Sequence, residues 1–168
     1  MSKTFFIADT HFNDSDIIRY CNRPFKNVEA QTKLLIENWN RVVDAEDEVW
    51  VLGDFFLFSD HTELDDHTEL DKCRRIKSLL NGKVNLIMGN HDIRSVEQYR
   101  KMGFDFVSPY PIILNDFFIL SHYPLQLSET TPYYNVYGHI HNDNKYKDNA
   151  TSRCVCVERT AYKPITIW

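Results

Sequence analysis

Seven residues whose side chains can bind metal ions follow short apolar segments of this chain. The apolar runs, such as Phe5–Ala8 and Val49–Leu52, are typical of buried strands. In sheets covered by helices, ligands bind beyond the carboxyl ends of the strands, so clusters far apart in the sequence are expected to meet there. The residues are Asp9, His11, Asp54, Asn90, His122, His139 and His141. Together they resemble the nitrogen and oxygen donors of a hydrolytic site with two metal ions.

The spacing within this set indicates how two ions would share it. Asp9 and His11 are two residues apart, and in an extended chain their side chains project to the same side, where one ion could bind both. His139 and His141 repeat that spacing. Asp54 follows a glycine, and its carboxylate is suited to bridging two cations. Each cluster alone is more typical of a turn or a helix cap, so the prediction of a metal centre rests on their combination.

The elements that must position these residues divide the chain into two halves. Up to Gly103 predicted strands alternate with predicted helices, and beyond it nearly every predicted element is a strand. This pattern predicts an α/β fold with two packed sheets and helices outside them, rather than one doubly wound sheet. Asn115-Asp116 is predicted to be a hairpin turn. The predicted helices span 28–43, 73–80 and 95–102, and the predicted strands span 3–8, 48–52, 84–88, 104–107, 112–114, 117–121, 136–137, 153–157 and 165–168.

Length and composition fit a single globular domain. The chain has 168 residues, 43% of them hydrophobic, and a net charge of −5, which argues against binding nucleic acid through a basic surface. No apolar run approaches the roughly 18 residues of a membrane span, and no secretory leader is expected. The four cysteines form no disulfide pattern, so we expect a reducing cytoplasm. Cys154 and Cys156 should face one side of a strand, as core residues.

A hexapeptide, DHTELD, occurs twice in tandem over residues 60–71. A repeat this short is no solenoid unit, and we interpret it as an insertion in a surface loop or at the start of the following helix. Its acidic residues suit the first turn of a helix. His61 and His67 within it are therefore expected to be solvated rather than to bind metal.

The motifs, taken in order, resemble those of the calcineurin-like metallophosphoesterase superfamily. The resemblance extends from residue 9 to residue 141, and segment 17–25 is similar to small members without a cap domain. It implies a four-layer sandwich, in which two mixed β-sheets are flanked by helices, within one domain spanning residues 1–168. The motifs that carry it are Asp9-x-His11, Gly53-Asp54, Gly89-Asn90-His91-Asp92, His122 and Gly138-His139-x-His141.

The resemblance also implies a division of the ligands between two ions. Asp9, His11, Asp54 and His141 would bind the first ion, and Asp54, Asn90, His122 and His139 the second, with Asp54 bridging. Mn²⁺ is the expected ion, and Fe, Zn²⁺, Ni²⁺ and Co²⁺ suit the same donors. The implied reaction is hydrolysis of a phosphomonoester or phosphodiester by a hydroxide that bridges the two ions.

Four other residues are candidates for roles beside the ions. The resemblance implies that His91 faces the substrate, where it would stabilise the phosphate or protonate the leaving group. Asp92 could orient His91 or cap the helix that begins near Ser95. Arg23 could contact phosphate or form a structural salt bridge, and Tyr123 could line the pocket.

The first motif departs from the pattern of small relatives. Asn13, Asp14 and Asp16 stand where such relatives often carry Gly, His and Asn, so a position that could lie beside the leaving group is acidic. The substrate preference is therefore left open by the sequence. We expect a small phosphate ester, with nucleotides among the candidates, and neither a membrane nor stable nucleic-acid binding.

Two alternatives remain beside the hydrolase. A catalytically weak or inactive scaffold that binds proteins would use the same fold, but such proteins typically lose a ligand or the catalytic histidine, and every predicted ligand and His91 are present. A nuclease acting on polynucleotides is disfavoured by the lack of a basic stripe. The oligomeric state is not readable from the sequence.

Overall fold

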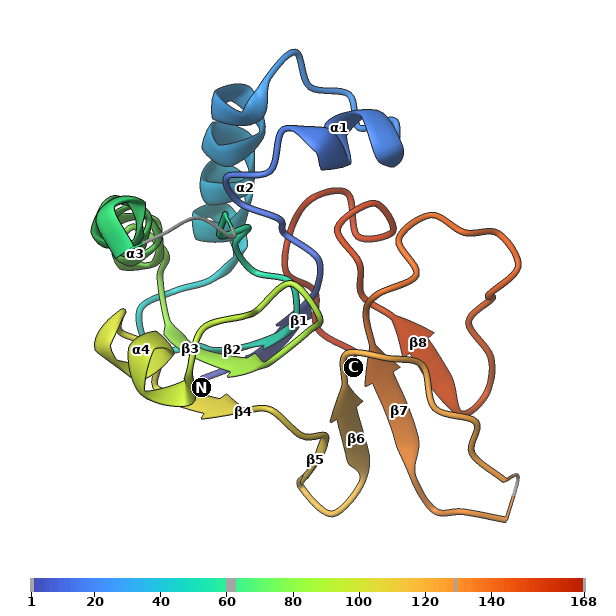
Figure 1. The fold of residues 1–168 in the computed structure, drawn as a ribbon. Helices are drawn as coiled ribbons and strands as arrows, with labels where there is room; N and C mark the ends of the chain where they lie inside the picture. The colour runs from blue at the N-terminus through green and yellow to red at the C-terminus, as the bar shows by residue number, and fades with distance from the viewer. Residues whose placement is uncertain (1, 60–62, 129, 168) are drawn as a thin grey trace.

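The computed structural model describes residues 2–59, 63–128 and 130–167, without the side chains of residues 63–67. It contains two four-stranded sheets, in the orders β1-β2-β3-β4 and β5-β6-β7-β8 (Figure 1). The two predicted sheets are thus confirmed. The elements are β1 Thr4–Ile7, α1 Asp16–Tyr20, α2 Val28–Val42, β2 Glu48–Leu52, α3 Glu63–Ser78, β3 Lys83–Ile87, α4 Val96–Lys101, β4 Phe106–Ser108, β5 Ile112–Leu114, β6 Phe118–Ser121, β7 Tyr134–Tyr137 and β8 Ser152–Cys154.

All strand pairs of the first sheet are parallel, which places their carboxyl ends at one edge. Parallel neighbours require crossover connections, and α2, α3 and α4 provide them. The second sheet is mixed, because β5 and β6 form an antiparallel hairpin while β7 and β8 run parallel to β6. Asn115 and Asp116 in that hairpin have φ values of 53° and 54°, which confirms the predicted turn.

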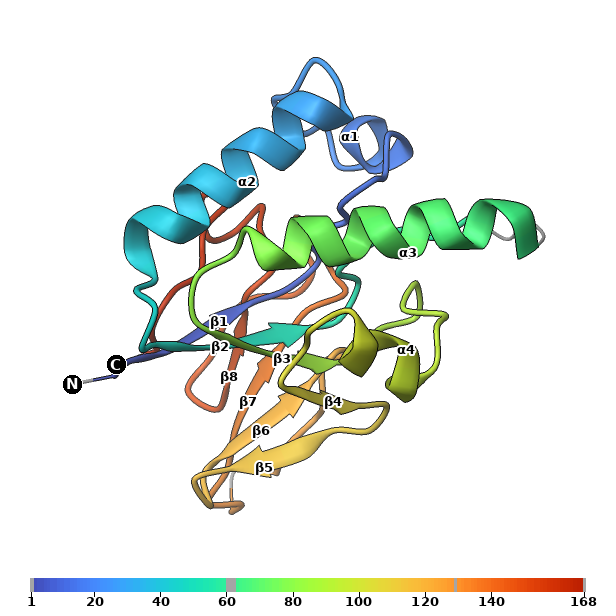
Figure 2. The same ribbon diagram turned by 90° about the vertical axis from the view of Figure 1, so that its left-hand side faces the viewer.

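Two long helices, α2 and α3, lie against the first sheet. Figure 2 shows α2 and α3 running across the outer face of the first sheet. In the part of the chain that the structure describes, loops cover the outer face of the second sheet. Asn135 on β7 is fully buried there and accepts a hydrogen bond from the Leu125 N–H at 2.9 Å. At Asn135, the outer side of β7 is therefore covered by the loop that follows β6.

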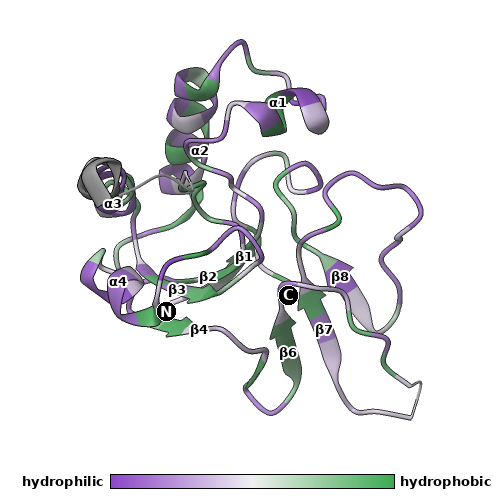
Figure 3. Cartoon of the chain, viewed as in Figure 1, coloured by the Kyte–Doolittle hydropathy of each residue, from purple (hydrophilic) through white to green (hydrophobic). Residues whose placement is uncertain are grey.

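The core has two main parts, one on each face of the first sheet. Val49 and Val51 of β2 face the helices, whereas Trp50 and Leu52 face the second sheet. This double burial explains why the strands of the first sheet are continuous apolar runs. Figure 3 shows β4 and β6 mostly in green, whereas much of the connecting loops is purple.

Several predicted elements differ from the structure in their bounds or type. Helix α1 was not predicted and lies in a segment expected to be a loop. A helix of about one turn is too short to show helical periodicity in the sequence. Helix α3 begins at Glu63 rather than residue 73, so the second copy of the duplicated hexapeptide is helical. His61 and the side chain of His67 lie outside the described residues. The predicted strand at 165–168 is reduced to an isolated bridge between Ile165 and Phe6.

The packing of α2 on the first sheet yields a stability prediction. Leu35 on α2 is 2% exposed within the core, so Leu35→Ala should lower the free energy of unfolding by about 2–5 kcal/mol. Leu79 is 52% exposed, and Leu79→Ala should change it by less than about 0.5 kcal/mol. Urea denaturation of both variants measures the difference, and equal losses would contradict this account of the packing.

Candidate metal centre

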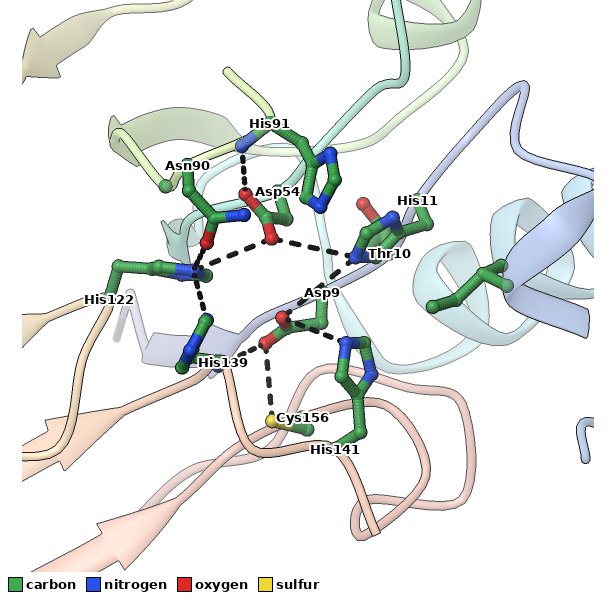
Figure 4. Close-up of polar contacts among 12 residues, drawn as sticks. Asp9, Thr10, His11, Asp54, Asn90, His91, His122, His139, His141 and Cys156 are labelled. Carbon is green, nitrogen blue, oxygen red and sulfur yellow. Dashed lines mark hydrogen bonds and ion pairs between the residues drawn. The ribbon is translucent and has the colours of Figure 1, made fainter. Parts of the chain in front are cut away.

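The residues predicted as metal ligands lie together at the carboxyl ends of strands from both sheets (Figure 4). Asp9 and His11 follow β1, Asp54 follows β2, Asn90 follows β3, His122 follows β6, and His139 and His141 follow β7. Two groups within this cluster have donor atoms close enough to share a metal ion. They are Asp9, His11 and His141, and Asp54, His122 and His139.

The first group encloses a position between Asp9, His11 and His141. The Asp9 Oδ1 atom lies 3.6 Å from His141 Nε2 and 4.0 Å from His11 Nε2. Asp9 Oδ1 and His11 Nε2 are both buried and have no hydrogen-bond partner. Buried polar atoms without a partner are rare, and these two face the same point. A divalent cation there would satisfy both atoms, so the residues fit a metal ion.

The second group is arranged around His122. Its Nε2 atom lies 3.0 Å from Asn90 Oδ1, 3.2 Å from His139 Nδ1 and 3.4 Å from Asp54 Oδ2. The same Asp54 Oδ2 lies 3.6 Å from His11 Nε2 of the first group. Asp54 therefore faces both positions, which is the placement that a bridging carboxylate requires.

Five of these residues have a left-handed backbone, which the sequence did not predict. The φ values are 58° at Asp9, 48° at His11, 54° at Asp54, 70° at His139 and 46° at His141. The extended conformation expected for the two i, i+2 pairs is thus wrong, although each pair does meet at the cluster. Such conformations cost about 1–3 kcal/mol each and persist where the surroundings enforce them, which is common at functional sites.

Two glycines allow the strand ends to approach one another. A Cβ atom on Gly89 would lie 2.2 Å from Asp54 Oδ1, and one on Gly138 would lie 2.5 Å from Asp9 Oδ2. Both distances are shorter than any real Cβ contact. Glycine in these two motifs is therefore required by the closeness of the carboxylates.

Comparison with known proteins identifies the family. A family model described as calcineurin-like phosphoesterase matches residues 2–159. The chain belongs to the calcineurin-like phosphoesterase family. Members of this family are generally metal-dependent, in agreement with the two donor groups.

This phosphoesterase-family chain is also similar to individual proteins. The uncharacterized protein MJ1445 of Methanocaldococcus jannaschii is 35% identical over 176 residues, which cover 99% of this chain and 88% of that protein. The solved protein of unknown function AQ665 from Aquifex aeolicus has a TM-score of 0.69 and 26% identity, and the match covers 96% of this chain and 94% of that one. Nuclease MPE of Pseudomonas putida has a TM-score of 0.51 and 24% identity, over 82% and 61% of the chains, which shows a shared fold.

Asp92, predicted as a catalytic residue, has a different place in this phosphoesterase fold. Its carboxylate accepts hydrogen bonds from the backbone N–H groups of Asp54 at 2.7 Å, Gly89 at 2.8 Å and Phe55 at 3.1 Å, and from the Tyr99 hydroxyl at 3.2 Å. Burial, followed by the charge of Asp54, raises the pKa of Asp92 to about 6. Asp92 therefore joins the loops after β2 and β3 rather than orienting His91. The helix cap is Ser95, which forms a capping box.

Arg23 does not contact the substrate side of the centre. It is 4% exposed, and its guanidinium donates to Glu158 Oε1 at 2.8 Å, to the Asp9 carbonyl at 2.8 Å and to the Thr10 carbonyl at 3.1 Å. A further N–H bond reaches the buried Gln31 at 3.0 Å. Of the two roles considered from the sequence, the structural salt bridge is the one observed.

The three departures from the family pattern also have defined places. Asp14 is buried, and its Oδ2 atom lies 2.9 Å from His11 Nδ1, while its Oδ1 atom accepts the backbone N–H of Asp16 and Ile17. Asn13 donates to the Leu57 carbonyl at 3.0 Å, and the Asp16 side chain is exposed. The acidic residue at position 14 therefore contacts His11, a predicted ligand, and accepts the first two backbone N–H groups of helix α1.

Glu158 was missed by the sequence interpretation because it stands in no motif. Its Oε1 atom lies 3.0 Å from His141 Nδ1. Burial opposes protonation of His141, but its contacts with Cys21, Glu158 and Asp9 raise its pKa to about 11. Burial likewise opposes the charge of Glu158, but the bond from His141 and the charge of Arg23 lower its pKa to about 2.

Cys156 was predicted to be a core residue and also contacts the centre. Its thiol lies 3.1 Å from Asp9 Oδ2, which also accepts the His139 backbone N–H at 2.8 Å. The Cys154 thiol lies 3.2 Å from Cys156 Sγ, as expected for two residues on the same side of a strand. Both sulfurs are free and buried.

His91 and Tyr123 lie on the open side of the centre. The His91 side chain is exposed, with its ring centroid 5.2 Å from that of His11, and its backbone N–H donates to Asp54 Oδ1 at 2.8 Å. The Tyr123 ring is half exposed and lies 4.5 Å from the His139 ring.

None of the helices among the described residues is long and apolar enough to cross a membrane.

The contact of Gly89 with Asp54 yields a prediction about this centre. In Gly89→Ala the new methyl group would displace the Asp54 carboxylate, so we expect loss of metal binding and a destabilisation of about 1–3 kcal/mol. Gly103→Ala is the control, because its Cβ would lie 3.7 Å from the nearest atom, although its φ of 99° adds strain. Elemental analysis after dialysis against Mn²⁺ should show metal in the control alone. Metal retained by Gly89→Ala would contradict the assigned role of Asp54.

Proposed function

We propose that this protein hydrolyses phosphate esters with two divalent cations bound between the seven residues of the centre. The observation that carries the proposal is the pair of donor groups that share Asp54, with buried donor atoms that lack any other partner. Membership of the calcineurin-like phosphoesterase family supports it. The first cation is assigned to Asp9, His11, Asp54 and His141, and the second to Asp54, Asn90, His122 and His139.

The residues of the chain fix the geometry that such a reaction needs. Asp54 is held through Oδ1 by the His91 backbone N–H, which leaves Oδ2 between the two positions. When bound, the cations would draw the phosphate to this point and lower the pKa of the attacking water. We choose Mn²⁺ for the assay, because imidazole, carboxylate and amide donors together suit first-row cations of this type.

His91 is proposed to contact the substrate phosphate. Its ring is exposed, and it stands beside the first group without being one of its donors. From there it would stabilise the phosphate charge or donate a proton to the leaving oxygen. Tyr123, on the opposite side near His139, is proposed to line the space for the ester group.

A small ester is the substrate class that we favour over a polynucleotide. The net charge of −5 gives the protein no attraction for a long polyanion. Asn90, His91 and Tyr123 are all exposed, so groups on either side of the phosphate would find room. This supports a small phosphodiester in particular, in a single domain without a cap.

Turnover should depend on Mn²⁺ and on Asp54. We expect hydrolysis of bis-p-nitrophenyl phosphate, p-nitrophenyl phosphate or a cyclic nucleotide in the presence of Mn²⁺, and its loss with EDTA. Asp54→Ala removes the shared carboxylate and should abolish turnover, whereas Asp71→Ala, on the exposed side of α3, should retain it. The assay is release of nitrophenol or phosphate. Equal rates for the wild type and Asp54→Ala would refute the proposal.

His91→Asn should separate chemistry from metal binding. Loss of the imidazole should lower kcat by about 10²–10⁴-fold, because a positioned acid or base contributes that much. Its metal content should stay at the wild-type level, because no predicted ligand is changed. Steady-state kinetics and elemental analysis of the same sample test both points. Loss of metal would instead make His91 a ligand.

A further inference from the structure

Each histidine of the first group contacts a carboxylate on the side of its ring that faces away from the cluster. His11 Nδ1 lies 2.9 Å from Asp14 Oδ2, and His141 Nδ1 lies 3.0 Å from Glu158 Oε1. Asp14 is 5% exposed, and the Glu158 side chain is 4% exposed. Each imidazole therefore has a buried carboxylate behind it and its Nε2 atom in front, toward Asp9.

The histidines of the second group have no such carboxylates among the described residues. His122 Nδ1 lies 2.9 Å from the Leu52 carbonyl oxygen. His139 directs Nδ1 toward His122 rather than outward. The third donor residue at this position, Asn90, is neutral and exposed. The two positions thus differ in the charge that surrounds them, although they share Asp54.

A carboxylate behind an imidazole has two effects on metal binding. It holds the proton on Nδ1, which leaves the Nε2 lone pair free for the cation, and it makes the ring a stronger donor. It also adds negative charge next to the cation. The first effect acts twice at the first position, through Asp14 and Glu158, whereas the charge of Glu158 is offset by the Arg23 guanidinium 2.7 Å away, so the second effect comes mainly from Asp14.

The first position is also held rigidly by its neighbours. Arg23 donates to Glu158 at 2.8 Å and to the Asp9 carbonyl at 2.8 Å, so it joins one supporting carboxylate to the backbone of a ligand. Asp9 Oδ2 accepts the His139 N–H and lies 3.1 Å from the Cys156 thiol, which directs Oδ1 toward the cluster. Little rearrangement is then needed when a cation binds.

We propose that the two metal positions are unequal, and that Asp14 and Glu158 make the position of Asp9, His11 and His141 the tighter one. They are positioning residues, which act through His11 and His141 rather than on the substrate. The first cation stays bound at low metal concentration, and the second exchanges. The inference rests on the proposed two-cation function, which it deepens.

Titration of the metal-free protein with Mn²⁺ tests the inequality directly. Calorimetry of the wild type should resolve two equivalents with dissociation constants at least about tenfold apart. At one equivalent the electron paramagnetic resonance spectrum should be that of isolated Mn²⁺, and magnetic coupling should appear only with the second. Two equal affinities, or coupling from the first addition, would overturn the inequality. If no Mn²⁺ binds at all, the two-cation function itself fails.

Variants of Asp14 and Glu158 test whether these two carboxylates strengthen Mn²⁺ binding at the first position. Asp14→Asn and Glu158→Gln keep the shape of the side chain but remove its charge. Each should raise the dissociation constant of the tighter Mn²⁺ equivalent by about 10–100-fold. The weaker equivalent should keep its affinity. Asp16→Asn is the matched control, because its carboxylate is exposed in the same segment and should leave both constants unchanged. An effect on the weaker equivalent, or none on the tighter one, would refute the assignment.

Folding must be separated from metal affinity in these variants. Glu158→Gln leaves the buried Arg23 without its charge partner, so it is expected to be less stable. Asp14→Asn has no such effect on Arg23 and carries the test if Glu158→Gln does not fold. Thermal unfolding of each metal-free variant, followed by circular dichroism, shows which samples are folded before titration.

Discussion

One buried carboxylate, that of Asp9, joins the two sheets at the edge where the centre lies. The backbone N–H of Asp9 donates to the Gly53 carbonyl at 3.0 Å within the first sheet. Its Oδ2 atom accepts the His139 N–H at 2.8 Å from the end of β7 in the second sheet. Because Asp9 is fully buried, these bonds fix both the meeting of the sheets and the direction of Oδ1. The other residues of the centre are placed relative to this junction.

The fold and the membership of the centre could be predicted because both depend on strong local patterns. Apolar runs marked the strands of the first sheet, since that sheet is buried on both faces, and the residues after them were the ones that meet. The hairpin turn at Asn115-Asp116 and the Ser95 cap were also predictable, because a few neighbouring residues determine each. Topology then brought Asp9 and His139 together, although they are 130 residues apart.

The parts that could not be predicted depend on contacts between segments. Nothing near Glu158 in the sequence indicates a metal centre, and only the fold places it behind His141. For Arg23 and Asp92 the sequence left a chemical and a structural role open, and only the structure shows that both are buried against backbone groups. The left-handed conformation of the predicted ligands was equally hidden, because Asp and His adopt it mainly where their surroundings enforce it. Motifs therefore predicted which residues meet, and not how they are held.

Charge explains why unequal positions would matter for a phosphate ester hydrolase. Four carboxylates contact the histidines of the centre, those of Asp9, Asp14, Asp54 and Glu158. With the guanidinium of Arg23, they leave three net negative charges. One divalent cation would leave the centre at −1, which repels a phosphate. Two would bring it to +1 before the attacking water loses its proton, so a phosphate is attracted only when both positions are filled. On this proposal, the extra carboxylates behind the histidines of the first position would make the second cation necessary for substrate binding. On this reasoning, occupancy of the weaker position sets the fraction of active protein.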